Sequence, residues 1–152
     1  MGLLKFCNIG IRVISATVPH HVVKTRSLTQ FYSEEAIEKF IEATGVEERR
    51  FVDNDKCASD LCYKSACQIF EETSIKPEDI DVLLFVSQTA DYKIPGTSII
   101  LQDKLGLKKT TIVYDINMSC SGFIHGLLMA YSFLQLPTIN NVMIMVGDSL
   151  SK

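Results

Sequence analysis

The sequence lacks the cysteine spacing of a disulfide framework or a zinc site. It has five cysteines, an odd number, and no two of them form a Cys-x-x-Cys pair. A disulfide scaffold usually carries an even number of cysteines, and structural zinc sites use closely spaced pairs. We therefore predict free thiols, no metal site and the reducing environment of the cytoplasm.

Long apolar runs and an excess of positive charge are also missing. The purely apolar pieces are much shorter than the roughly 20 residues needed to span a bilayer, and no secretory signal is recognisable. The net charge of −3 at pH 7 argues against a general nucleic-acid-binding protein. With 47% hydrophobic and 22% charged residues, the chain is predicted to be globular, with neither membrane nor nucleic acid as a partner.

Apolar periodicity and helix caps predict alternating strands and helices. Strands are expected at residues 6–18, 80–87, 110–116 and 141–146, helices at 33–44, 59–73, 95–105 and 121–136, and a charged surface loop at 47–57. This order predicts an α/β fold with a mostly parallel sheet and helices on both faces. Because few residues follow the last strand, we expect residues 1–152 to be an incomplete domain, truncated before its last strand and with apolar surface exposed.

Cys120 lies in the segment Ser119-Cys120-Ser121-Gly122, between a predicted strand and a predicted helix. Helix N-termini carry unpaired N–H groups and a positive dipole end, which favour a thiolate. The small neighbours leave room for a substrate, and sites in parallel sheets form beyond the carboxyl ends of strands. The sequence thus indicates a nucleophile for acyl transfer, with a buried structural cysteine as the alternative.

Other polar residues near this segment favour structural roles. His125 follows Cys120 by five residues on the same helix, which turns it away from the sulfur, so we expect a packed or hydrogen-bonded histidine. His20 and His21 are expected in a solvent-facing turn. Asp115 precedes the cysteine segment and could hydrogen-bond that turn, and Asp148 stands at a strand end. A structural role is favoured over a functional one for both.

Five segments carry a specific pattern in chain order. They are the opening strand and turn at 9–19, Thr44-Gly45-Val46 through Arg50, residues 80–89 with Ile94-Pro95, the cysteine segment at 115–123, and the strand at 142–149. Together they resemble the N-terminal half of a beta-ketoacyl-acyl-carrier-protein synthase III, within the thiolase-like superfamily.

The resemblance implies a thiolase-like half-domain and a two-step reaction of fatty acid or related lipid or polyketide biosynthesis. Cys120 would take an acyl group from acyl-CoA, which is a substrate and not a resident cofactor. The acyl-enzyme would then condense with a malonyl-carrier protein after loss of CO₂. Thr44, Arg49 and Ile94 are implied to contact substrate, although a solvated loop charge is the alternative for Arg49. A cytoplasmic homodimer that meets an acyl carrier protein is also implied.

The sequence departs from the family at several positions. Lys39 and Ala43 stand where an aromatic residue and an arginine usually contact the CoA adenine, and Ile94 stands where a phenylalanine lines the acyl pocket. These differences favour a donor other than acetyl-CoA. The family's catalytic histidine and asparagine belong to its second half, so we expect this chain alone not to complete the condensation.

Two further functions remain open. The chain could be a truncated, non-catalytic paralogue that binds an acyl group or a partner. It could also be a thiol-redox sensor that uses Cys120, although the sequence offers no nearby resolving cysteine.

Overall fold

The chain forms two compact units. The computed structural model describes residues 4–150. The first unit comprises Met1–Thr17 and Cys57–Asp148, and the second comprises Val18–Lys56 and Ser149–Lys152.

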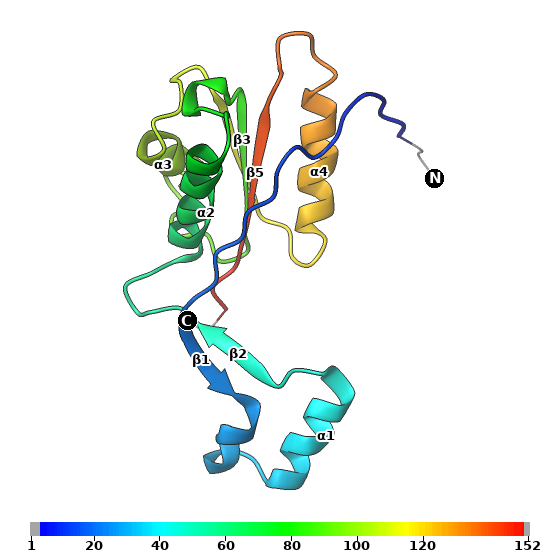
Figure 1. Cartoon of the computed structure of the whole chain (residues 1–152), viewed down its shortest axis with the longest axis vertical. Coiled ribbons are helices and arrows are strands. Elements are labelled where there is room, and N and C mark those ends of the chain that lie inside the picture. Colours follow the sequence, from blue (N-terminus) through cyan, green and yellow to red (C-terminus); the bar gives the residue numbers. More distant parts are fainter. Residues whose placement is uncertain (1–3, 151–152) are drawn as a thin grey trace. The chain divides into compact units, whose positions relative to one another are not determined.

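A parallel sheet is the centre of the first unit (Figure 1). Its elements are α2 (Ala58–Glu72), the 3₁₀ turn η2 (Pro77–Asp79), β3 (Val82–Val86), α3 (Thr97–Lys104), β4 (Ile112–Ile116), α4 (Gly122–Phe133) and β5 (Val142–Val146). The strand order is β4-β3-β5, and both pairs are parallel, with Val82 opposite Ile112 and Val142. The predicted α/β class with a parallel sheet is therefore confirmed.

The sheet separates two apolar layers. All five residues of β3 are buried, as expected for a central strand covered on both faces. Leu83 and Phe85 pack with residues of α2 and α3, whereas Leu84 and Val86 pack with α4. Figure 1 shows α2 and α3 on one side of β3 and β5, with α4 on the other. Each fully buried Leu, Val or Phe contributes about 1.5–3 kcal/mol of burial energy.

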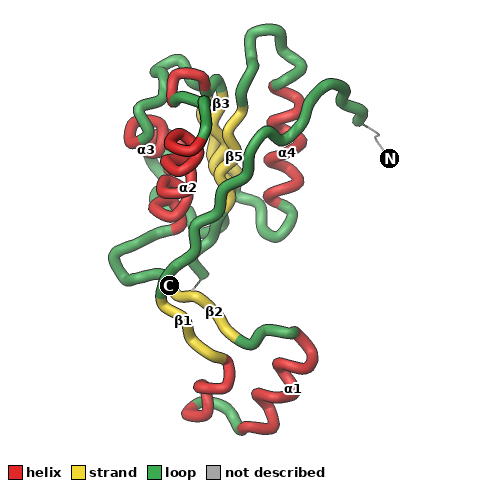
Figure 2. The backbone as a smooth tube through the Cα atoms, in the orientation of Figure 1, coloured by secondary structure: helices red, strands yellow, loops and turns green. Residues whose placement is uncertain are grey.

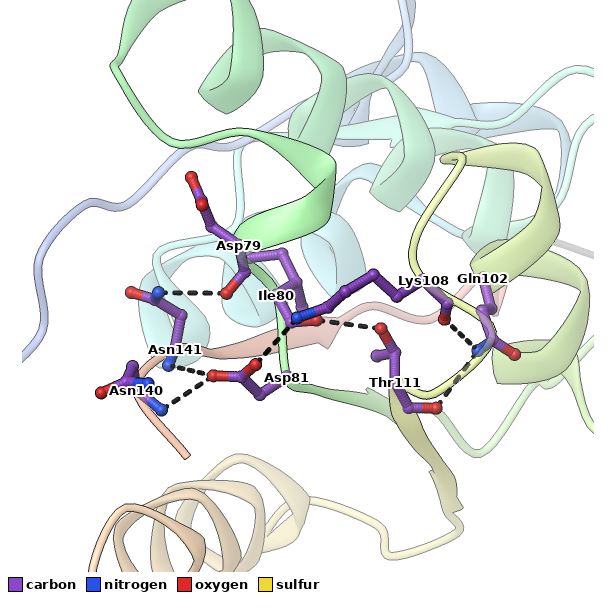
Figure 3. Close-up of polar contacts among 8 residues, drawn as sticks. All are labelled: Asp79, Ile80, Asp81, Gln102, Lys108, Thr111, Asn140 and Asn141. Atoms are coloured by element: carbon purple, nitrogen blue, oxygen red, sulfur yellow. Dashed lines mark hydrogen bonds and ion pairs between the residues drawn. The ribbon is translucent and has the colours of Figure 1, made fainter. Parts of the chain in front are cut away.

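Asp81 ties the amino ends of the strands together (Figure 3). Its carboxylate accepts hydrogen bonds from the backbone N–H groups of Asn140 (2.8 Å) and Asn141 (3.2 Å), and it forms an ion pair with Lys108 Nζ (3.1 Å). Burial raises the pKa of Asp81, but these three partners outweigh burial and lower it below its ordinary value. Beside it, the Thr111 hydroxyl donates to the Ile80 carbonyl at 2.9 Å.

The strand predicted at residues 6–18 is wrong. This part of the chain has no assigned strand, and Figure 2 draws it as a loop. Its contacts are made by side chains: Ser15 Oγ donates to Gln68 Oε1 of α2 at 3.0 Å, and the Phe6 ring packs edge-on against Tyr131 of α4. A strand needs a partner backbone for its hydrogen bonds, and apolar patterning cannot reveal whether one exists. Cys7, expected inside this strand, is exposed.

The second unit contains a short hairpin and two helical segments. Its elements are β1 (His21–Lys24), the 3₁₀ segment η1 (Thr25–Gln30), α1 (Glu34–Thr44) and β2 (Glu48–Phe51), with β1 and β2 antiparallel. Helix α1 begins and ends as predicted. Ser33 Oγ accepts the N–H of Ala36 at 3.3 Å, and Gly45 has the left-handed φ of 71° that suits glycine after a helix.

Two predictions are corrected: one missed a strand, and the other placed the start of a helix too early. The loop expected at residues 47–57 contains strand β2, which pairs with β1 although Glu48, Arg49 and Arg50 are exposed. No apolar face marks such a strand in the sequence. Helix α3 starts at Thr97 rather than Pro95, because Gly96 is its N-cap.

Candidate active site

Cys120 lies in an exposed turn that connects β4 to α4. The Ser119 carbonyl accepts the N–H of Gly122 at 2.8 Å, which closes the turn around the cysteine. The Ser121 carbonyl then accepts the N–H of His125 at 3.1 Å, the first turn of α4. The predicted location, at a strand-to-helix turn and near a helix N-terminus, is confirmed.

Two glycines bring α4 close to the sheet beneath this turn. A Cβ at Gly122 would lie 2.7 Å from Val86 Cγ1, and a Cβ at Gly126 would lie 3.1 Å from Val86 Cγ2. Real Cβ atoms essentially never approach another atom within 3.0 Å. Glycine is thus the only residue that fits at position 122 without a shift in its neighbours.

Asp148 joins the carboxyl ends of β3 and β5. Its Oδ1 accepts hydrogen bonds from Ser87 Oγ (3.0 Å) and the backbone N–H of Gln88 (2.8 Å), and its Oδ2 accepts from Gln88 Nε2 (3.1 Å). Partial burial raises the pKa of Asp148, but these bonds and one from the Thr89 N–H outweigh burial and lower it. The carboxylate therefore has a structural role, the one favoured from the sequence.

Asp115 has its own structural partner at the N-terminus of α3. Its Oδ2 accepts the N–H of Thr97 and its Oδ1 accepts the N–H of Ser98, both at 2.7 Å. These N–H groups have no partner within the helix, so a carboxylate stabilises them and the positive end of the dipole. The sequence prediction of a hydrogen-bonding role was right, but the partner is α3 rather than the cysteine turn.

A second thiol, Cys62 of α2, is buried behind the carboxyl ends of the strands. Burial raises its pKa to about 11, and the nearby carboxylates of Asp91 and Asp148 add to the rise. Asp91 is held by a hydrogen bond from Ser59 Oγ. Cys62 is thus a packed, protonated thiol at neutral pH.

The other predicted site residues fall in both units. Ile94, in the first unit, is 92% exposed. Thr44 and Arg49 lie in the second unit. The Thr44 hydroxyl donates to the Phe40 carbonyl at 2.7 Å, and the Arg49 guanidinium lies 5.1 Å from the centre of the Phe40 ring.

The three histidines are exposed as expected, but His21 begins strand β1 rather than lying in the predicted turn. His125 is exposed, and its Nδ1 is 2.9 Å from the Ser121 carbonyl, so it is hydrogen-bonded as expected. His20 and His21 are exposed. None of the helices within residues 4–150 has the length and apolar character needed to cross a membrane.

Several known proteins are similar to this chain in sequence or in structure. The sequence model of 3-oxoacyl-[acyl-carrier-protein (ACP)] synthase III matches residues 114–152, which include the Cys120 turn. The chain is 35% identical over 149 residues to a beta-ketoacyl-[acyl-carrier-protein] synthase III of Fusobacterium nucleatum, covering 95% of this chain and 44% of the relative. It is 32% identical over 147 residues to the synthase III of Staphylococcus aureus, covering 95% of this chain and 46% of the relative.

A solved structure agrees with these sequence relatives. The crystal structure of a 3-oxoacyl-(acyl-carrier protein) synthase from Burkholderia xenovorans LB400 superposes with a TM-score of 0.86 at 30% identity, covering 91% of this chain and 40% of that one. The parallel sheet with helices on both faces is therefore a thiolase-like fold. Over nearly its whole length the chain is similar to part of a beta-ketoacyl-acyl-carrier-protein synthase III, and it spans less than half the length of these relatives.

Proposed function

We propose that Cys120 is the nucleophile of an acyl transfer of the synthase III type. The observation that supports this most directly is the position of its thiol, exposed in the turn between β4 and the N-terminus of α4. The matched family segment includes this turn. Neither Cys62, which is buried, nor Cys57 and Cys67, which are half-buried, offers comparable access.

The proposed first step transfers an acyl group from acyl-CoA to the protein. The Cys120 thiolate attacks the thioester carbonyl carbon, and the bond from that carbon to the CoA sulfur then breaks. CoA leaves with its sulfur protonated, so one thioester replaces another and the thiol proton passes to CoA. The backbone N–H of Cys120 is the proposed donor to the oxygen that becomes negative in the transition state.

In the whole synthase, the proposed second step forms a carbon–carbon bond. Loss of CO₂ from a malonyl-carrier protein leaves a carbanion, which attacks the acyl-cysteine carbonyl and releases the Cys120 thiolate. Thr44, Arg49 and Ile94 are the proposed substrate contacts. The acyl carrier protein, a second copy of the chain and a cytoplasmic location complete the proposal, which follows from the resemblance to the family.

Intact-protein mass spectrometry tests the first step. The purified chain is incubated with acetyl-CoA and with longer acyl-CoAs, and the mass gained is assigned to a peptide. We expect one acyl group on Cys120 with at least one donor. The adduct should disappear in Cys120→Ala and remain in Cys7→Ala, which removes the other exposed thiol.

The outcomes separate the candidate functions. An adduct that survives Cys120→Ala, or no adduct with any donor, would overturn the nucleophile role. Acyl-CoA bound without any covalent adduct would instead favour a non-catalytic, acyl-binding paralogue. Rapid oxidation of Cys120 by dilute peroxide, with no acylation, would favour a redox sensor.

A further inference from the structure

We propose that Val86 and Gly122 are positioning residues for Cys120: the contact between them sets where the cysteine turn lies above the sheet. This inference rests on the proposed function, because it concerns the acylation of the same thiol. It assigns a role in that reaction to the buried side chain of Val86.

Gly122 lies closer to the Val86 side chain than any residue with a Cβ could lie without a shift in its neighbours. A Cβ on Gly122 would lie 2.7 Å from Val86 Cγ1 and 3.5 Å from Met118 Cβ. Met118 precedes Cys120 and Gly122 follows it, so both ends of the short cysteine segment meet at this point. The Gly122 N–H is also the donor that closes the turn onto the Ser119 carbonyl.

Val86 is the fixed side of this contact. It is 3% exposed and ends the central strand β3. Its carbonyl accepts the N–H of Gly147 at 3.2 Å, and the next residue, Ser87, donates its N–H to the Ile116 carbonyl at 3.1 Å. Both neighbouring strands therefore hold this strand end, and a β-branched side chain has little rotamer freedom to withdraw.

The cysteine turn is the movable side. Its residues 117–121 are exposed and belong to no helix or strand. A methyl group added at position 122 would therefore push the turn outward rather than displace β3. Cys120 would move with the turn, and a displacement of about 1 Å of a reacting group can slow a reaction by about 100-fold.

Gly126 provides a matched comparison one helical turn further along α4. A Cβ there would lie 3.1 Å from Val86 Cγ2 and 3.3 Å from Ile144 Cγ2, contacts that require a shift of only a few tenths of an ångström in these neighbours. Gly126→Ala therefore strains the same helix–sheet contact without pushing directly on the cysteine turn. Gly10→Ala is a second control, since nothing lies within 4 Å of its added Cβ.

The experiment measures two rates for Cys120 in the purified chain: acylation by the best acyl-CoA, and alkylation by iodoacetamide, both read on the Cys120 peptide. Unfolding by urea is followed in parallel. The variants are Gly122→Ala, Gly126→Ala, Gly10→Ala, Val86→Ala and the double variant Val86→Ala/Gly122→Ala. We expect Gly122→Ala to slow acylation about 10- to 100-fold and to slow alkylation as well.

Rescue distinguishes positioning from general loss of stability. Val86→Ala removes the methyl group that a Cβ added at position 122 would strike, so the double variant should acylate about tenfold faster than Gly122→Ala alone. Gly126→Ala and Gly10→Ala should stay within about threefold of the unmodified chain. If Gly122→Ala does not fold, the double variant is compared with Val86→Ala, and equal rates are expected.

Three results would overturn the proposal: an unchanged Cys120 rate in Gly122→Ala, an equal loss in Gly126→Ala, or no rescue by Val86→Ala. If the unmodified chain forms no acyl adduct, the proposed function fails. The alkylation rates of the same variants then still decide whether Val86 and Gly122 position the thiol.

Discussion

At the scale of single residues, the thiols of this chain lie in contrasting surroundings. Cys120 and Cys7 are exposed, whereas Cys62 is buried with a pKa raised to about 11. The thiolate is the reactive form. We therefore predict that iodoacetamide at pH 8 labels Cys7 and Cys120 well before Cys62, as measured by timed quenching and peptide mass spectrometry.

The pH dependence of Cys62 follows from the same shift. Its pKa is higher in the folded chain than the value of about 8.5 expected when unfolded, so the unfolded chain loses the proton first. The stability linked to Cys62 is present below pH about 8.5 and is lost as the pH rises toward the folded pKa.

For the iodoacetamide experiment, labelling in urea provides the control, because all five thiols should then react alike. Equal labelling of Cys62 and Cys7 in the folded chain would contradict the prediction.

Asp81 provides a second residue-scale prediction. Its pKa is lowered in the folded chain, so its contribution is present above the unfolded value of about 3.9 and is lost as the pH falls through the folded value. Asp81→Asn should lower the free energy of unfolding at pH 7 by about 1–2 kcal/mol. It should also flatten the loss of stability below pH about 4. Urea titrations across pH measure both, and the exposed Glu78→Gln is the control. An unchanged acid slope in Asp81→Asn would refute the linkage.

At the scale of elements, Asp115 connects strand β4 to the first turn of α3. Removing its carboxylate with Asp115→Ala leaves the N–H groups of Thr97 and Ser98 without this partner. We expect a loss of about 1–2 kcal/mol in unfolding free energy, comparable to the loss of a helix cap. Hydrogen exchange at the Thr97 and Ser98 amides should become faster.

The control for this prediction lies on the same helix. Asp103 is exposed near the end of α3, so Asp103→Ala should leave amide exchange in the first turn unchanged. Gly96→Ala should also make amide exchange in the first turn of α3 faster, because its Cβ would lie 2.5 Å from Asp115 Oδ2 and displace that carboxylate. Exchange at Thr97 that stays slow in Asp115→Ala would show that the carboxylate does not stabilise this helix.

Elements with local signals could be predicted from the sequence. The cap Ser33 and the glycine Gly45 bound α1 as expected, and the apolar run of β3 correctly indicated a central strand. The ladder of β1 and β2 could not be predicted, because its exposed side chains give no alternating pattern and its partner lies far along the chain. The strand predicted at residues 6–18 was wrong for the opposite reason: this segment has a strand-like composition, but its backbone pairs with no other strand.

The candidate site was predictable to a similar extent. The flanking elements locate Cys120 in a strand-to-helix turn, because both have clear apolar patterns. The contact of Val86 with Gly122 and the bond of Asp115 to α3 join residues that are distant in sequence. Such contacts depend on how the elements pack, and no local pattern encodes them.

At the scale of the whole molecule, α4 is apolar on more than the face that packs against the sheet. Gly126 and Ala130 are buried, but large apolar side chains remain exposed elsewhere on the helix: Phe123 (45%), Ile124 (63%) and Leu128 (38%). A helix that is apolar on all sides is usually covered on all sides. Exposed apolar patches promote association.

We therefore predict that the purified chain self-associates through α4. Ile124→Lys should shift the concentration at which association begins upward by about 10- to 100-fold, because burial of one such side chain is worth about 1.5–3 kcal/mol. Light scattering over a dilution series measures this shift. Phe31→Lys changes an apolar residue of the second unit with similar exposure (69%) and should have little effect, which separates α4 from general surface hydrophobicity. A monodisperse monomer at every concentration, or equal effects of the two variants, would contradict a role for α4.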